Sequence, residues 1–391
     1  MQQRTLFIAD HLRGARSVTE LCAEYGISRK TAYKWIDRFI RRGPAGLEDR
    51  SRRPHATPTA TPAPIVAALI ALRHRHPTWG PKKLVAYLQR RHPTWTLPGR
   101  SVTAALLKRR GLIRRRTPRR VIGHPGKPNA LILAPNHVWC ADFKGQFRMG
   151  NGRYCYPLTV TDGFSRYLLG CRGLPSTAVQ GAKPVFTRLF QEYGLPQYIR
   201  SDNGVPFATN TLARLSRLSA WWVRLGILPQ LIEPGRPQQN GRHERMHRPL
   251  KQEATRPPAR AMASQQRRFD RFRREFNDER PHEALDQRPP AALYEPSPRA
   301  MPTNLPPLEY PDRFEVRYVS ANGGIRWNKA WVNVSTVCIG EYVGLEEIDD
   351  GIWNVYFGRL QLGRLLERSM KIEDAYGRLY RHRRLLPMSS D

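Results

Sequence analysis

The chain has 391 residues, of which 40% are hydrophobic, so it is long enough for several domains and can bury at least one core. This hydrophobic fraction excludes the possibility that the whole chain is a disordered basic tail. Lys and Arg number 66 against 32 Asp and Glu, a net charge of +34, which makes a polyanion the natural partner. A membrane surface could attract the same charge, but the sequence has no run of about 18 apolar residues and no amphipathic lipid-facing helix, so we predict nucleic acid.

The five cysteines are scattered along the chain, and none belongs to a Cys-x-x-Cys pair. This spacing indicates neither a disulfide framework nor a cysteine zinc site, and it fits a reduced cytoplasm. The N-terminal residues also lack the apolar stretch of a secretory signal.

Residues 1–43 are predicted to form the first DNA-binding domain, because residues 17–43 have a helix-turn-helix pattern. Gly26 separates two short helices, and Ser28 is a good N-cap for the second. The apolar residues of this second helix recur at helical spacing and are Tyr33, Ile36 and Phe39.

The second helix of this motif would present three cations to DNA, namely Arg29, Lys30 and Lys34. A helical hairpin with a solvated basic face is the alternative interpretation. We favour recognition of DNA, because the whole chain is so strongly cationic.

Residues 44–64 are rich in Pro, Ala, Thr and Arg, which predicts an extended linker. Residues 65–120 regain helical periodicity in three segments, so we predict a second helix-turn-helix or winged-helix unit there. It ends in a run of cations predicted to bind DNA that includes Arg114, Arg115 and Arg116. Three histidines in this region lack cysteine partners and are predicted to face phosphates or solvent: His74, His76 and His92.

Residues 135–295 change to an α/β pattern. Three strands come first, the last two joined by an Asp162-Gly163 turn, which is a strong hairpin signal. Helices and strands then alternate, which predicts a mixed sheet with helices on both faces. Residues 310–381 form short strands at regular intervals, with turns at Asn322-Gly323-Gly324 and Asp350-Gly351, and predict a small C-terminal β-barrel.

The candidate chemistry lies among the seven acids of residues 142–253. Four of them have structural explanations: a hairpin turn, a helix end, a Pro-Gly break, and a helix face pointing away from Glu244; they are Asp162, Glu192, Glu233 and Glu253. The other three, Asp142, Asp202 and Glu244, call for another explanation.

Asp142 sits in the middle of an apolar strand, where a carboxylate is costly unless it is paired or bound to metal. Asp202 ends an apolar strand at a sharp turn, and Glu244 lies on a helix. Carboxylate oxygens suit Mg²⁺ or Mn²⁺, and two such ions can catalyse an in-line displacement at phosphorus. Structural ion pairs could also explain each acid taken alone.

The sequence around these acids makes the signal specific. NHVWCADFKGQF, IRSDNGVPFA and PGRPQQNGRHERMHRPLKQEA resemble the three blocks of the integrase-like core of bacterial insertion-sequence transposases, in the DDE superfamily. The closest resemblance is to the insertion-sequence family numbered four hundred and eighty-one, and it extends to the helix-turn-helix, the GLEDRSRRP junction and the sheet-rich tail. It implies a ribonuclease H-like core whose metal-binding triad is Asp142, Asp202 and Glu244.

The resemblance predicts a transposase that binds the terminal inverted repeats of its element, cleaves the ends and transfers them to target DNA with two Mg²⁺ or Mn²⁺ ions. We expect a homo-oligomer, a dimer or larger, on double-stranded DNA in the bacterial cytoplasm, associated with the nucleoid and not with a membrane. The alternatives are a DNA-binding regulator with a non-catalytic core and a nuclease that cuts without joining.

The helix of Glu244 also carries the cations Arg245, Arg248 and Lys251. Arg248 and Lys251 follow Glu244 by four and seven residues and so share its face. A solvated basic surface would explain them, but their phase relative to Glu244 predicts contact with the reacting DNA strand.

Overall fold

The computed structural model describes residues 2–49, 60–113, 132–232 and 241–374. The chain divides into two compact units, Met1–Thr61 and Pro62–Asp391. The finer domain boundaries within the second unit stay predictions.

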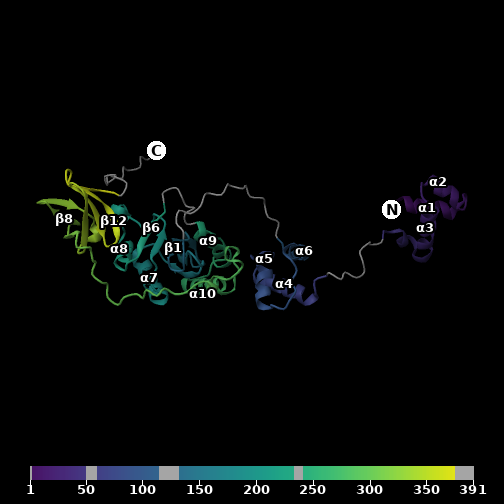
Figure 1. The fold of residues 1–391 in the computed structure, drawn as a ribbon. Helices are drawn as coiled ribbons and strands as arrows, with labels where there is room; N and C mark the ends of the chain where they lie inside the picture. Colours follow the sequence, from purple (N-terminus) through teal and green to yellow (C-terminus); the bar gives the residue numbers. More distant parts are fainter. Residues whose placement is uncertain (1, 50–59, 114–131, 233–240, 375–391) are drawn as a thin grey trace. The chain divides into compact units, whose positions relative to one another are not determined.

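The first unit is a three-helix domain that contains the predicted helix-turn-helix (Figure 1). Its elements are α1 (Gln2–Arg13), α2 (Val18–Glu24), α3 (Arg29–Arg42) and the 3-10 turn η1 (Gly43–Leu47). Ser28 caps α3 as predicted, since its side chain accepts a hydrogen bond from the Thr31 amide. Ser17 and Glu20 form a capping box at the start of α2.

The core of this unit corrects the predicted helix face. Phe7, Leu21 and Ala32 are fully buried, and Ile36 and Phe39 pack against them. Tyr33, in contrast, is 59% exposed, because the buried stripe of α3 runs through Ala32.

The second unit begins with the three helices predicted after the linker, α4 (Ala63–Arg75), α5 (Pro81–Arg91) and α6 (Arg100–Arg109). They enclose an apolar cluster around Leu69, Trp79 and Leu84. His76 is buried and stacks on Trp79 with ring centroids 3.9 Å apart, so the prediction that it faces phosphate or solvent is wrong. His74 and His92 are exposed as predicted.

The centre of the second unit is a mixed six-stranded sheet. Its strands are β1 (Val138–Phe143), β2 (Phe147–Arg148), β3 (Tyr154–Asp162), β4 (Leu168–Leu174), β5 (Tyr198–Ser201) and β6 (Leu228–Leu231). β3 pairs antiparallel with β1, β2 and β4, whereas β5 lies parallel between β1 and β6. Three antiparallel strands followed by two parallel ones confirm the predicted mixed sheet.

Helices pack against this sheet: α7 (Val179–Tyr193), α8 (Arg217–Arg224), α9 (Gly241–Glu253) and α10 (Met262–Arg274), which continues as a π-helical turn over Glu275–Glu279. The larger core cluster joins the strands to α7 and α8 through side chains such as Trp139, Phe190 and Trp222. A second cluster joins them to α9 and α10 through Leu250 and Phe269. Helices therefore contribute to two separate cores of the sheet.

The C-terminal part is sheet-rich, as predicted. It contains β7 (Glu315–Tyr318), β8 (Gly324–Trp327), β9 (Ala330–Asn333), β10 (Tyr342–Asp349), β11 (Ile352–Phe357), β12 (Leu360–Leu366) and β13 (Lys371–Glu373). The predicted turns occur, with positive φ at Gly323 and Gly351.

The predicted barrel, however, is not observed. The described strands form a five-stranded sheet in the order β13-β12-β11-β10-β7 and a separate two-stranded sheet, β8-β9, and neither closes on itself. β7 is an edge strand whose Val316 and Tyr318 are exposed, so its alternating pattern identified a strand but did not indicate whether the sheet closes. Within the described ranges, no helix has the length and apolarity needed to cross a bilayer.

Candidate active site

Asp142 lies on β1, the strand between β3 and β5 at the centre of the sheet. Its side chain is 18% exposed. Burial and, after it, the negative charges of Asp202 and Glu244 together raise the pKa of Asp142 to about 7. These two carboxylates therefore lie close enough to Asp142 to repel it.

The pairing of β1 with β5 explains the proximity of Asp142 and Asp202. The two strands run parallel, with Cys140 opposite Arg200. Asp142 and Asp202 each follow this pair by two residues, so both leave the same end of adjacent strands on the same face. The Gly204 amide donates a hydrogen bond to Asp202 Oδ1 at 3.2 Å, and burial raises the pKa of Asp202.

Glu244 lies in the first turn of α9. This helix packs on β1 and buries one face, which includes His243, Met246, His247 and Leu250. Glu244 is exposed at the border of that face, one turn before His247. A strand, a turn and a helix thus each supply one carboxylate.

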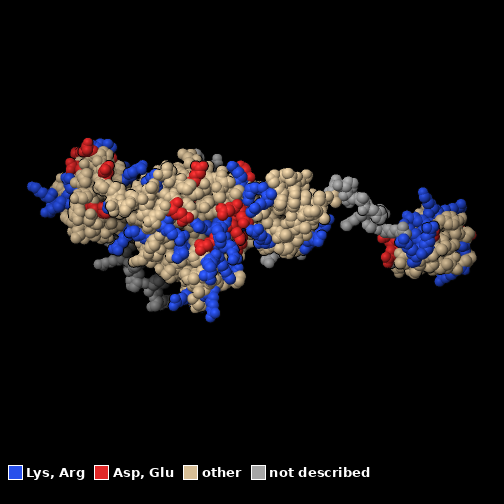
Figure 2. Space-filling view, turned by 90° about the horizontal axis from the view of Figure 1, so that it is seen from below, with Lys and Arg blue, Asp and Glu red and all other residues tan. Residues whose placement is uncertain are grey.

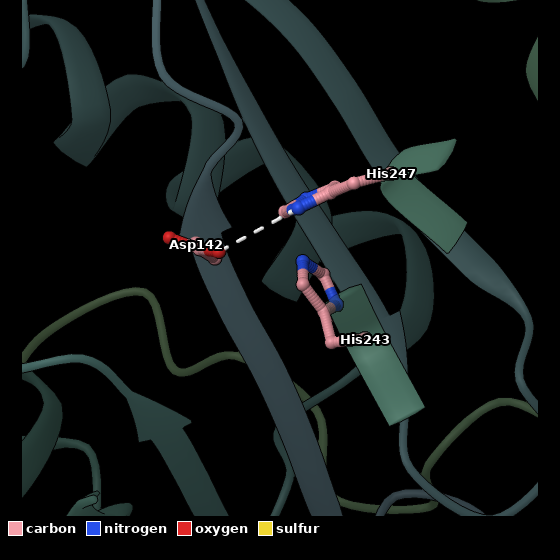
Figure 3. Close-up of side chains that lie close together, drawn as sticks. All are labelled: Asp142, His243 and His247. Carbon is pink, nitrogen blue, oxygen red and sulfur yellow. Dashed lines mark ion pairs between the residues drawn. The ribbon is translucent and has the colours of Figure 1, made fainter. Parts of the chain in front are cut away.

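Two histidines that the sequence analysis did not single out complete the cluster. His243 and His247 reach from α9 toward Asp142 (Figure 3), and ligand atoms of these three residues lie within 4.8 Å of one another. His247 Nδ1 is 3.7 Å from Asp142 Oδ2. The spacing of two histidines at i and i+4 on one helix was the available signal, because it places both on one face.

The donor atoms fit a divalent metal. Asp142, Asp202 and Glu244 offer carboxylate oxygens, which Mg²⁺ and Mn²⁺ prefer. A cation at this position would also relieve the mutual repulsion that raises the pKa of Asp142. Among the described residues, Lys144 is the cation whose charge lowers this pKa.

The four acids given structural explanations lie elsewhere or outside the described residues. Asp162 is buried and accepts hydrogen bonds from the amides of Asn136 and Ser165, and Glu253 accepts two from Arg280. Glu192 lies 4.0 Å from Arg273, and Glu233 lies outside the described residues.

The predicted DNA-binding cations are exposed wherever the structure describes them. Arg29, Lys30 and Lys34 lie on α3, and Figure 2 shows Lys and Arg side chains gathered on the surface of the first unit. On α9 the exposed cations are Arg245, Arg248 and Lys251. Arg114, Arg115 and Arg116 fall outside the described residues.

Comparison with protein families agrees with this arrangement. An integrase core domain matches residues 133–237 and a second integrase core model matches residues 225–290. A helix-turn-helix domain matches residues 3–55, and a homeodomain-like domain matches residues 31–106. Fold, site and matches together define an integrase-core protein with N-terminal helix-turn-helix domains.

Individual relatives identify a narrower family within the integrase-core proteins. An insertion element IS476 protein of Xanthomonas euvesicatoria is 30% identical over 254 residues, which are 63% of this chain and 69% of the relative. An insertion element IS407 protein of Burkholderia multivorans is 28% identical over 238 residues, 58% of this chain and 79% of the relative. The chain belongs to this family of insertion-element proteins with an integrase-like core. Membership of the family numbered four hundred and eighty-one stays a prediction.

Among solved structures, the magnesium complex of the HTLV-2 integrase catalytic core aligns with a TM-score of 0.34 and 14% identity, over 42% of this chain and 99% of that chain.

Proposed function

We propose that the protein is a transposase that cleaves the ends of its insertion element and joins them to target DNA at one metal-dependent site. The observation that carries this proposal is the meeting of Asp142, Asp202 and Glu244, in a chain of net charge +34. Carboxylates that repel one another at the end of two adjacent inner strands are unfavourable unless they serve to bind cations.

In this proposal the triad would hold two Mg²⁺ or Mn²⁺ ions. When bound, the ions activate the attacking oxygen and stabilise the leaving oxygen of an in-line displacement. The triad itself needs only to stay ionised and correctly spaced. Its support on three elements of one packed core supplies that spacing.

The reaction has two phosphoryl transfers. In the first, water attacks a phosphorus at the element end, the bond to the 3′ oxygen breaks, and a 3′-hydroxyl is released. In the second, that hydroxyl attacks a phosphorus of the target strand, the bond from this phosphorus to the 3′ oxygen of the target breaks and leaves a 3′-hydroxyl on the target, and the new junction forms. Both transfers need the same charge arrangement, so a single site serves for both.

DNA recognition is assigned to separate surfaces. Arg29, Lys30 and Lys34 on α3 read the terminal repeats, helped by the helices of residues 62–113, and Arg245, Arg248 and Lys251 hold the reacting strand beside Glu244. Two element ends must be processed together, so the active species is a homo-oligomer, a dimer or larger.

The decisive experiment incubates the purified protein with labelled element ends, target DNA and Mn²⁺, and sequences the products. Junctions between the 3′ end of the element and target DNA are the expected result. Nicked ends without junctions would identify a nuclease instead. Selective binding with no new ends would identify a DNA-binding regulator.

A further inference from the structure

The hydroxyl of Thr159 organises both histidines of α9. It donates to the Asp142 carbonyl oxygen at 3.0 Å and lies 2.8 Å from Nε2 of His243 and 2.8 Å from Nε2 of His247. A hydroxyl has one proton and two lone pairs, and a carbonyl oxygen can only accept. Since the proton of Thr159 goes to that carbonyl, both imidazoles must donate their Nε2 protons to the hydroxyl.

This assignment fixes the tautomer of each ring. A neutral imidazole carries one proton, so Nδ1 of both histidines is an unprotonated acceptor. Nδ1 of His243 is 2.6 Å from the Thr161 hydroxyl, which donates to it. Both nitrogens of His243 are therefore engaged in hydrogen bonds to threonines.

His247 differs, because its Nδ1 faces the carboxylate of Asp142. The separation of 3.7 Å from Oδ2 is too long for a hydrogen bond. At this distance no proton is shared between His247 Nδ1 and Asp142, and the only proton of the ring is the one that Nε2 donates to Thr159. The lone pair of His247 Nδ1 therefore faces Asp142 Oδ2, and two electron-rich atoms at this distance repel each other. A cation bound between them would make the arrangement favourable.

We infer that His247 Nδ1 is a nitrogen ligand for a divalent metal that Asp142 also binds. The inference rests on the proposed function and deepens it, because it gives the site a mixed oxygen and nitrogen donor set. Imidazole nitrogen binds transition metals more strongly than Mg²⁺. The site is therefore selective for Mn²⁺ over Mg²⁺, and Zn²⁺ competes for it.

Two substitutions separate the ligand from its support. In His247→Gln the side-chain amide nitrogen can take the place of Nε2 and still donate to Thr159, while the Nδ1 ligand is removed. In His247→Asn the amide oxygen takes the place of Nδ1, so an oxygen donor replaces the nitrogen. His243→Gln is the matched control, since both nitrogens of His243 already bond to threonines.

The first readout is pulsed electron paramagnetic resonance of Mn²⁺ bound to the full chain. We expect ¹⁴N coupling in the wild type and in His243→Gln, and its loss in both His247 variants. We also expect Mn²⁺ affinity to fall about tenfold in His247→Gln, within the range seen when groups around a metal are removed, while Mg²⁺ affinity changes less. Bound Mn²⁺ without ¹⁴N coupling in the wild type would overturn the inference.

A second readout needs no substitution and so does not depend on a variant folding. In protein labelled with ¹⁵N-histidine, adding Zn²⁺ should move one unprotonated Nδ1 resonance and leave the Nε2–H resonances in place. No such movement at saturating Zn²⁺ contradicts the inference.

Asp142→Asn separates this inference from the proposed function. Suppose that Asp142→Asn loses Mn²⁺ binding but the wild type shows no ¹⁴N coupling. The carboxylate triad would then still be supported as the metal site, and only the assignment of His247 as a ligand would be refuted. Unchanged Mn²⁺ binding in Asp142→Asn refutes the metal site as a whole, and the proposed function with it.

Discussion

Asp142 and Thr159 lie opposite each other in the ladder between β1 and β3, and the Thr159 hydroxyl donates to the Asp142 carbonyl oxygen at 3.0 Å. This bond ties the strand that bears Asp142 to the histidines of α9. The position of the β1 backbone and the position of helix α9 are thus coupled through the hydroxyl of Thr159. The negative charge of the site and the hydrogen bonds that support it can therefore be tested by separate substitutions.

Asp142→Asn, Asp202→Asn and Glu244→Gln should each lower cleavage and joining by at least about a hundredfold, equivalent to about 2.7 kcal/mol in the barrier. Each change removes a charge and keeps the shape, so binding to element ends should stay near normal. Gel-shift and joining assays on the same preparations measure both properties. Near-normal joining by any one variant would remove that residue from the triad.

Asp162→Asn should instead destabilise the fold. The buried Asp162 carboxylate accepts hydrogen bonds from the Asn136 amide and from the amide and hydroxyl of Ser165. An amide in its place cannot accept them all, which should lower the free energy of unfolding by about 2 kcal/mol. Urea unfolding measures this change. Asp142→Asn is the contrast: without metal it should leave stability unchanged or increase it, because a carboxylate in a repulsive setting is neutralised.

Replacing Arg29, Lys30 and Lys34 with Ala should abolish selectivity for element ends over random DNA. The slope of log K against log salt should also become shallower by about 0.9 for each phosphate that these cations neutralise in the wild type. Arg13 and Arg41 serve as matched controls, since each is already paired with an acid on its own helix. If the control variant loses selectivity equally, Arg29, Lys30 and Lys34 are not the residues that recognise the element ends. Deleting residues 1–116 should have the same effect as the triple substitution, or a larger one.

Arg248→Ala combined with Lys251→Ala should reduce strand transfer by about a hundredfold, because a reacting end displaced by about 1 Å loses its alignment. General DNA affinity should fall only slightly, since many other cations remain. Arg271 and Arg274, exposed on α10, provide a double-Ala control of equal charge. Wild-type joining at physiological salt in the α9 variant would show that this face does not meet DNA.

His282 should make the fold sensitive to acid. Burial lowers the pKa of His282 to about 3, helped by the cations Lys83 and Arg280, whereas the unfolded chain has an ordinary value near ~6.5. The unfolded state binds the proton more readily, so stability is complete above about pH 6.5 and decreases by about 1.4 kcal/mol per pH unit between about pH 6.5 and pH 3. His282→Gln, which cannot titrate, should reduce the slope of stability against pH by about 1.4 kcal/mol per pH unit, equivalent to one proton, in unfolding experiments at about pH 4 to 5.5. An identical slope in the variant would contradict this assignment.

Local signals in the sequence predicted those features whose causes are local. The cap at Ser28 and the turns at Gly323 and Gly351 depend on a few neighbouring residues, and the structure contains all three. Helix α1 was not predicted, because it lacks an acidic first turn and its Phe7 and Ile8 find their partners in other helices.

The sequence analysis did not correctly predict features that depend on residues far apart in the chain. His247 gains its orientation from Thr159, 88 residues away, and no local pattern records that contact. The predicted barrel was not observed among the described strands, for a similar reason. Alternation identifies strands such as β7, but closure depends on whether the first and last strands meet. The triad rests on matched motif blocks, since its residues are dispersed over 103 positions.

The parallel register of β1 and β5 has a consequence for when the protein can act on DNA. Asp142 and Asp202 align only if Cys140 lies opposite Arg200. Because side chains alternate between faces, a slip by one residue would turn one carboxylate to the other side of the sheet. Under the proposed function, a nascent or misfolded chain therefore bears the same acids but lacks the metal site, so cleavage of DNA would begin only after folding is complete.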